Sequence, residues 1–513
     1  MPMNPGLDTV ARTKKAPIET IDDAGQELYN HLYQGCSILR GCGVSADEYK
    51  TYLFPLMFLK RISDVYDEEY RHAMEESDDD EEYARMADCH RFQIPPGCHW
   101  SDIRDTTFDV GAKINTSMRK IESSNPRTLY GIFSDFDEAS WTNKEKLPDE
   151  NLINLVEHLS MIRLDNEAIS ADVMGQAYEY LIKKFADETK ESAGEFYTPR
   201  AVVRLMIRYL DPKGGESVYD PACGTGGMLI ESMNHIEEKN LTLGKLFGQE
   251  SNLTTASIAR MNLFLHGSDD FKIARGDTLR NPLFLIDGKL QTFDCVVANP
   301  PFSLKKWGAD KWDSDPYGRN IFGTPSDNSG DYAWLQHMVK SMDPKHGRMG
   351  VVLPQGVLFK KDVRDIRKKL LDSNKLEAVV QLAGNLFYGT QLAPCILFLR
   401  NGRTEDTIRF IDASNIFKKG RAQNFLLDEH VDEIYNALTS DDDIPEISKT
   451  IHLSEIDQET AELNVSKYVV KEFVDDTPPY DEVLQKLREN NRRIIELEAE
   501  IDKMIMEGGF LNE

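Results

Sequence analysis

The feature that most constrains this fold is an alternation of short apolar runs with amphipathic stretches between about Asn166 and Ile411. Short strands separated by helices predict an α/β fold with a doubly wound, mainly parallel sheet. In such sheets ligands bind at the carboxyl ends of the strands, near the point where the strand order reverses. The expected strands are Ser217–Tyr219, Leu246–Gln249, Phe293–Ala298, Met349–Leu353 and Cys395–Leu399, and the expected helices include Gly226–Glu237 and Asp331–Met342.

The regions on either side of this core have helical patterns. Leu53, Met57, Ile62 and Val65 recur at helical spacing with charged residues between them. The acidic run 75–82 (EESDDDEE) is expected to be a solvated loop. We therefore predict a helical N-terminal domain over residues 1–170, a catalytic domain over 171–417 and a C-terminal extension over 418–513.

The extension ends in a long expected helix, Tyr480–Met506, with a seam at coiled-coil spacing. An intramolecular helix pair and docking onto a partner's helices both remain open. The seam residues are Val483, Leu487, Asn490, Ile494, Leu497, Ile501 and Met504.

Charge and composition limit the class of protein. The 513 residues carry a formal net charge of −27, whereas a protein that binds DNA without a partner protein normally has a basic surface. A DNA-binding chain this acidic must confine its basic groups to one face or use a basic partner. The 7 cysteines are odd in number and scattered, which is typical of reduced thiols. A metal site at the Cys89-His90 and Cys98-His99 pairs is disfavoured for lack of context, and no metal is expected.

Targeting signals are not expected either. Residues 1–17 contain no apolar run typical of a signal peptide, and no run of 18 apolar residues occurs. We therefore expect a cytoplasmic protein without a membrane-spanning helix.

A glycine-rich loop, Asp220-Pro-Ala-Cys-Gly-Thr-Gly-Gly227, follows the first expected strand and opens a helix. Its glycines allow a ligand to approach the backbone, and the helix start offers free N–H groups. The Walker and dinucleotide-binding patterns do not fit this loop. Taken alone, it also fits a plain strand-to-helix turn. Glu250 ends the next strand, where an acidic residue suits ribose hydroxyls, and Asp277 follows a third short segment.

The tetrapeptide Asn299-Pro300-Pro301-Phe302 follows the buried strand Phe293–Ala298 and indicates the chemistry. Two prolines fix the backbone, so the Asn299 amide oxygen and the Pro300 carbonyl can point the same way. Two converging acceptors suit an NH2 group, whose lone pair is freed for attack when both hydrogens are bonded. Phe302 can stack on a flat ring. A strand-ending turn does not need this tetrapeptide.

These motifs resemble those of DNA adenine-N6 methylases of the gamma class. The segment Gly194-Glu-Phe-Tyr-Thr-Pro-Arg200, the glycine loop and Asn-Pro-Pro-Phe occur in the order of that class. The whole chain, including the stretch 54–61 (FPLMFLKR), resembles the modification subunit of type I restriction-modification systems. The resemblance implies a Rossmann-like methyltransferase core with a helical N-terminal domain and a helical tail.

The resemblance also implies a role for each motif. Asn299, Pro300, Pro301 and Phe302 would hold a flipped adenine. The remaining residues would bind S-adenosylmethionine, with the segment 195–200 at its amino-acid end, Glu250 at the ribose and Asp277 at the adenine. They are Glu195, Phe196, Tyr197, Thr198, Pro199, Arg200, Asp220, Gly224, Thr225, Gly226, Gly227, Glu250 and Asp277.

Two other functions are weighed against DNA methylation. A protein glutamine methyltransferase acts on a similar amide NH2, but those enzymes resemble Asn-Pro-Pro-Tyr and are smaller. A non-catalytic cofactor-binding scaffold of a defence complex does not need an intact Asn-Pro-Pro-Phe.

The expected partners follow from the resemblance and from the charge. They are double-stranded DNA, a specificity subunit, a second copy of the chain in a complex of two such chains with one specificity subunit, and a restriction subunit. In the loop Ser303–Asp331, the side chains Lys305, Lys306, Lys311 and Arg319 are candidates for phosphate contacts. At −27, we expect the free chain to bind DNA weakly and without sequence preference.

Overall fold

The computed structural model describes residues 23–45, 48–126, 128–133, 141–189, 198–239, 241–242, 244–268, 270–387, 390–421, 423–470 and 479–507. The chain forms two compact units, residues 1–469 and 470–513. Each unit is described by itself. Among the described residues, no helix has both the length and the apolarity that crossing a bilayer requires.

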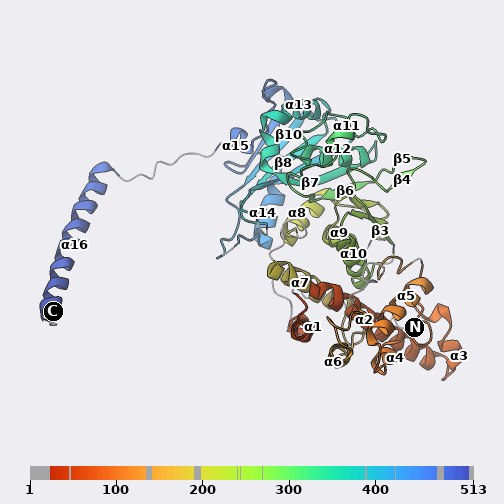
Figure 1. Ribbon diagram of the computed structural model, residues 1–513. Helices are drawn as coiled ribbons and strands as arrows, with labels where there is room; N and C mark the ends of the chain where they lie inside the picture. Colours follow the sequence, from red (N-terminus) through yellow and green to blue (C-terminus); the bar gives the residue numbers. More distant parts are fainter. Residues whose placement is uncertain are drawn as a thin grey trace, which may run out of the picture. The chain divides into compact units, whose positions relative to one another are not determined.

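The first unit is built on a mixed sheet of nine strands in the order β11-β10-β8-β9-β7-β6-β1-β2-β3 (Figure 1). β9 is antiparallel to β7 and β8, and β11 is antiparallel to β10, while the other pairs are parallel. A short hairpin of β4 (Leu285–Ile286) and β5 (Lys289–Leu290) stands apart. The strands are β1 (Val218–Asp220), β2 (Leu246–Glu250), β3 (Phe271–Arg275), β6 (Cys295–Ala298), β7 (Arg348–Pro354), β8 (Leu376–Leu382), β9 (Pro394–Arg400), β10 (Thr407–Ala413) and β11 (Ser448–His452).

Helices cover both faces of this sheet and produce two apolar cores. One core joins the sheet to α8 (Arg200–Leu210), α9 (Gly227–Glu238), α10 (Leu253–Leu265) and α14 (Asp428–Thr439). The other joins the opposite face to α12 (Asp331–Ser341), α13 (Arg364–Asp372) and α15 (Val465–Tyr468). A doubly wound sheet is buried on both faces, which explains why strands such as β6 and β7 are apolar throughout.

This architecture confirms the predicted α/β fold with a helical N-terminal region and a helical tail. All five expected strands form within a residue or two of their predicted bounds. β3, β8, β10 and β11 complete the sheet, and β11 lies beyond residue 417, where the sequence placed the end of the catalytic domain.

The N-terminal helices pack around α2 (Tyr49–Glu76), which is buried on most of its surface. They join the catalytic region through a shared core in which Phe58 of α2 contacts Phe264 of α10. The helices are α1 (Asp23–Gly41), α2, α3 (Glu81–Ala84), α4 (Trp100–Arg104), α5 (Val110–Ser124), α6 (Asp149–Ser160) and α7 (Ala171–Thr189).

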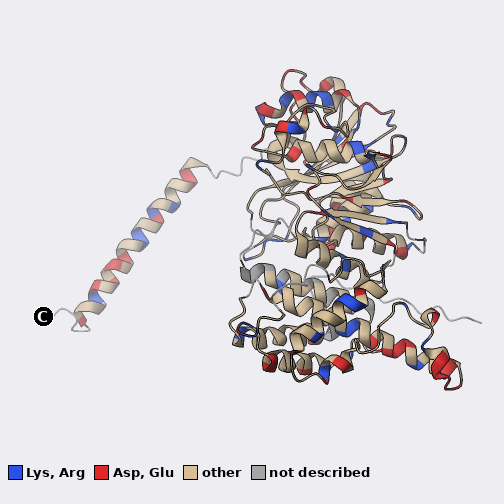
Figure 2. Cartoon of the chain, turned by 45° about the vertical axis from the view of Figure 1, so that its right-hand side comes forward, with Lys and Arg blue, Asp and Glu red and all other residues tan. Residues whose placement is uncertain are grey.

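Charged residues of α2 are also buried. Hydrogen bonds to the segment that leads into α7 compensate for their burial. The Arg61 guanidinium donates to the carbonyl oxygen of Ile169 at 3.1 Å, and Glu68 accepts from the backbone N–H of Asn166 and Glu167. The acidic run 75–82 spans the end of α2, a turn and the start of α3, and its carboxylates gather at an exposed corner (Figure 2).

The second unit contains α16 (Tyr480–Glu507), and none of its side chains is buried. Leu487, Ile494 and Ile501 of the predicted seam are all exposed. In the described part of this unit there is no second helix against which the seam could pack.

Candidate active site

The site lies at the carboxyl edge of the sheet, where the strand order reverses at β1. Asp220 ends β1, and Asn299 directly follows the neighbouring strand β6. Strands run from β1 to β2 and β3 on one side and from β6 onward on the other. This reversal is the position at which open α/β sheets bind ligands.

Hydrogen bonds tie together the loops that follow β1, β2 and β3. The Gly224 N–H donates to Glu250 Oε2 at 3.1 Å, and the Gly276 N–H donates to the Glu250 carbonyl at 2.9 Å. The Thr278 hydroxyl donates to the Pro221 carbonyl at 2.6 Å. The three loops therefore form one bonded wall, and Glu250 is its central acceptor.

Two glycines of the first loop adopt left-handed backbone conformations. Gly224 has φ 52° and Gly226, which precedes α9, has φ 86°. A Cβ on Gly226 would meet no atom closer than 3.6 Å, so the need for glycine comes from the backbone conformation and not from crowding.

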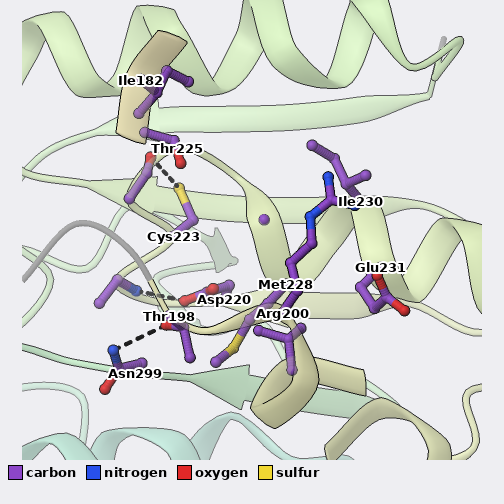
Figure 3. Close-up of a pocket in the computed structure, with 14 residues that line it drawn as sticks. Ile182, Thr198, Arg200, Asp220, Cys223, Thr225, Met228, Ile230, Glu231 and Asn299 are labelled. Atoms are coloured by element: carbon purple, nitrogen blue, oxygen red, sulfur yellow. Dashed lines mark hydrogen bonds between the residues drawn. The ribbon is translucent and has the colours of Figure 1, made fainter. Parts of the chain in front are cut away.

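A pocket lies between this wall and the start of α8 (Figure 3). α7 adds Ile182 and α9 adds Met228 and Ile230, none of which the motifs had indicated. Of the residues expected from the sequence, seven line it, namely Thr198, Arg200, Asp220, Gly224, Thr225, Gly227 and Asn299.

The other expected cofactor residues lie around or outside this pocket. Glu250 supports the glycine loop from behind, and Asp277 is half-exposed and accepts from the Arg280 N–H at 3.1 Å. Pro199 precedes α8. Glu195, Phe196 and Tyr197 lie outside the described residues.

The pocket wall carries buried carboxyl groups. Asp220 is 2% exposed and accepts from the Ala222 N–H at 3.0 Å. Burial, with a smaller contribution from the nearby charge of Glu250, raises the pKa of Asp220 to about 8. Burial likewise raises the pKa of Glu250. No lysine or arginine of the described residues pairs with either carboxyl group, and burial disfavours their ionised forms. A positively charged ligand at this wall would stabilise the ionised forms, so the wall favours such a ligand.

Asn299 presents one unused acceptor at the pocket. Its side-chain Nδ2 donates to the Thr198 hydroxyl at 2.9 Å (Figure 3). Its Oδ1 is buried and has no hydrogen-bond partner among the residues that the structure describes. A buried acceptor left unpaired costs roughly 1–3 kcal/mol, so this oxygen is suited to receive a donor from a ligand.

Phe302 lies next to Asn299 at the same edge. Its half-buried ring packs 6.2 Å from the ring of Phe387, tilted by 46°. The following turn is held by Asp331, whose Oδ1 accepts from the Ser303 N–H at 2.8 Å. Phe387 was missed by the sequence reasoning because it comes from the distant loop after β8 and belongs to no recognised motif.

The structure corrects the expectation that Arg319 contacts phosphates. Arg319 is buried, pairs with Asp315 at 2.6 Å and donates to the carbonyls of Thr278 and Leu279. It therefore holds the loop after β3 in place. Lys305, Lys306 and Lys311 are exposed.

Comparison with known proteins decides the family. The model of the family "N-6 DNA Methylase" matches residues 169–477, and that of the "HsdM N-terminal domain" matches residues 28–159. The chain belongs to the N-6 DNA methylase family.

Its relatives within the family are methylase subunits of type I restriction enzymes. The MjaVIII methylase subunit of Methanocaldococcus jannaschii is 31% identical over 95% of this chain and 86% of its own length. The HindI methylase subunit of Haemophilus influenzae is 33% identical over 80% of this chain and 94% of its own length. The crystal structure of a type I methyltransferase subunit from Streptococcus thermophilus is 28% identical, with a TM-score of 0.75 over 87% of this chain and 100% of the other.

These findings confirm the resemblance drawn from the motifs. The chain is a methylase subunit of the type I restriction-modification class and a DNA methyltransferase. Protein glutamine methylation and a non-catalytic role are not favoured.

Proposed function

We propose that this chain transfers a methyl group from S-adenosylmethionine to the N6 amino group of an adenine extruded from DNA. The observation that carries the proposal is the buried, unpartnered Oδ1 of Asn299 beside a pocket walled by buried carboxyl groups. A donor NH2 and a cationic ligand are the two chemistries that these features need.

Residues on the β1 side would hold the cofactor, which supplies an electrophilic methyl group on a positively charged sulfur. The buried Asp220 with its raised pKa fits such a cation, and the left-handed glycines keep the loop clear of side chains. Arg200, Thr225 and Gly227 line the same pocket. Glu250 is proposed for the ribose and Asp277 for the adenine. Glu195, Phe196 and Tyr197 remain proposed contacts to the amino-acid end.

Residues on the β6 side would hold the target base. Extruding a base costs a few kcal/mol of stacking, which contact with an aromatic ring such as Phe302 partly restores. Asn299 Oδ1 and the Pro300 carbonyl would accept the two amino hydrogens, with Pro301 fixing the turn. Accepting both hydrogens keeps the nitrogen lone pair available for the methyl carbon.

Thr198 has a second role in this proposal. A free amide can present either its oxygen or its nitrogen to the substrate. Because Nδ2 is bonded to the Thr198 hydroxyl, Oδ1 is the atom that remains to accept from the base. Thr198 therefore orients Asn299 and is a positioning residue as well as part of the cofactor pocket.

The partners proposed for this chain are a specificity subunit, a second copy of itself and a restriction subunit. The exposed seam of α16 supports docking of the specificity subunit, because an apolar stripe at coiled-coil spacing binds another helix. Deleting residues 480–513 is expected to release that subunit on co-purification. A truncated chain that still forms the full complex and methylates one defined site would place the contact elsewhere.

Methyl transfer from labelled S-adenosylmethionine tests the catalytic proposal directly. We expect label at adenine N6 in duplex DNA and none in glutamine-containing proteins, with the complex that co-purifies with the chain as the enzyme. Label in protein but not in DNA would contradict the proposal.

A further inference from the structure

The carboxyl edge of the sheet from β6 to β10 is basic in an otherwise acidic chain. The segments between the ends of β6, β7, β8 and β10 and the next α-helix or strand of the chain contain seven lysine and arginine residues but one carboxylate, Asp362, whereas Asp310, Asp313, Asp315 and Asp327 follow in and after α11 (Ala309–Trp312). Six exposed lysines define what we call the basic rim, which consists of Lys305, Lys306, Lys360, Lys361, Lys418 and Lys419.

The charges of the basic rim are not neutralised within the protein. Among the residues that the structure describes, no ion pair joins any of the six lysines to a carboxylate. By contrast, the buried arginines Arg319 and Arg409 are paired with Asp315 and Asp443. The rim lysines are therefore available to an external anion.

Contacts join the loops after β6, β8 and β10 to one another. The loop after β10 is tied to the loop after β8 by bonds from Asn424 N to the Asn385 carbonyl at 2.9 Å and from Gln423 Nε2 to the Leu386 carbonyl at 2.6 Å. Phe387 of that loop contacts Phe302, which begins the segment leading to Lys305. The rim thus starts beside the candidate active site.

The length of the rim suits a nucleic-acid backbone. Four strand-to-strand steps separate β6 from β10, which at about 4.8 Å per step gives about 19 Å. Duplex DNA carries one phosphate charge per about 1.7 Å of axis with both strands counted, so roughly eleven charges lie along such a length and some of them face the protein.

We propose that the basic rim is the surface on which this chain binds the phosphates of the duplex whose adenine enters the site at Asn299. This inference rests on the proposed function. Lysine is a point charge that reads no base edge, so the rim supplies affinity and register without sequence preference. If the rim binds phosphates, the free chain should bind DNA more tightly than its net charge of −27 led us to expect.

Two variants of the full chain with the same change in charge test the proposal. The rim variant, Lys305→Gln, Lys361→Gln and Lys419→Gln, removes one lysine from each basic loop. The control, Lys289→Gln, Lys340→Gln and Lys345→Gln, removes three exposed lysines near the amino ends of β6 and β7. None of the six belongs to the proposed catalytic or cofactor-binding residues.

Binding of a labelled duplex is measured by anisotropy from 20 to 200 mM KCl. We expect the rim variant to bind roughly thirtyfold more weakly at 50 mM and to lower the slope of log Kd against log salt by about 2.7. The control should change the slope by less than about 0.5. Equal slopes for the two variants, or no binding by the wild type at 20 mM, would overturn the proposal.

Methylation kinetics of the co-purified complex provide the second measurement. The rim variant should raise KM for DNA and leave kcat unchanged at saturating DNA, whereas a lower kcat at unchanged KM would overturn the proposal. Absence of methyl transfer by the wild-type complex would contradict the proposed function and leave the difference in salt slopes in place.

Discussion

The two halves of the carboxyl edge differ in charge although they belong to one sheet. The half formed by β1, β2 and β3 presents Asp220, Glu250 and Asp277, and two of these carboxyl groups are buried. The half from β6 to β10 presents the basic rim, all of it exposed. Asn299 lies where the two halves meet.

This difference shows that net charge says little about local recognition. A small cationic ligand is attracted by a negative electrostatic potential and a polyanion by a positive one. Buried carboxyl groups on one side and solvated lysines on the other provide both potentials within one site. The acidic surplus that lowers the net charge includes groups remote from this edge, such as those at the α2–α3 corner (Figure 2).

The largest effect is expected from Asn299→Ala. This change should lower methyl transfer but leave cofactor binding at one half of the edge and DNA binding at the other half intact. Losing one aligned acceptor costs on the order of 3 kcal/mol of transition-state stabilisation, or roughly a hundredfold in kcat. Calorimetry should find cofactor affinity nearly unchanged, and anisotropy should find duplex binding nearly unchanged. Wild-type turnover in this variant would rule out Asn299 as the acceptor.

Thr198→Val should lower kcat about tenfold, because the Asn299 amide loses the hydrogen bond that fixes its orientation. Thr198→Ser keeps the hydroxyl and serves as the matched control, with kcat close to wild type. If both variants lose cofactor affinity equally and keep kcat, Thr198 acts through the cofactor pocket alone.

The affinity for S-adenosylmethionine at the half formed by β1, β2 and β3 should depend on pH through Asp220. Its pKa of about 8 means that the carboxyl is mostly protonated at pH 6.5 and mostly ionised at pH 8.5. Affinity for S-adenosylmethionine should therefore rise with pH across this range, by roughly five- to tenfold if binding lowers the pKa by about one unit.

S-adenosylhomocysteine, which lacks the sulfonium charge, should show a shallower rise. Asp220→Asn should flatten the rise, and an identical rise in wild type and variant would assign it to another group.

The smallest effect is expected from Gly226→Ala. With φ at 86°, an alanine costs about 1 kcal/mol in the free energy of unfolding, measured by urea denaturation. Gly227→Ala is the control, since a Cβ there meets nothing within 4 Å and its φ is outside the left-handed region. Equal stability of the two variants would show that the loop relaxes around residue 226.

Much of the fold and of the chemistry followed from the sequence. Period and length placed five strands, and Asn299 could be assigned to a strand end because prolines directly follow it. The glycine loop was found because left-handed conformations leave a compositional trace at Gly224 and Gly226. Local patterns of this kind are readable because they constrain backbone and hydrogen bonding within a few residues.

Four features depended on contacts that no local pattern encodes. The direction of β9 depends on pairing with β7 and β8, and Arg319 looked like a phosphate ligand until its pairing with Asp315 was seen. Thr198 meets Asn299 across 101 residues of sequence, and the basic rim joins lysines from loops that are up to 114 residues apart. The sequence by itself determined which chemical groups the chain carries and which elements form. Only the tertiary structure decided which groups share a surface, because parallel strands bring their carboxyl ends to one edge whatever the length of chain between them.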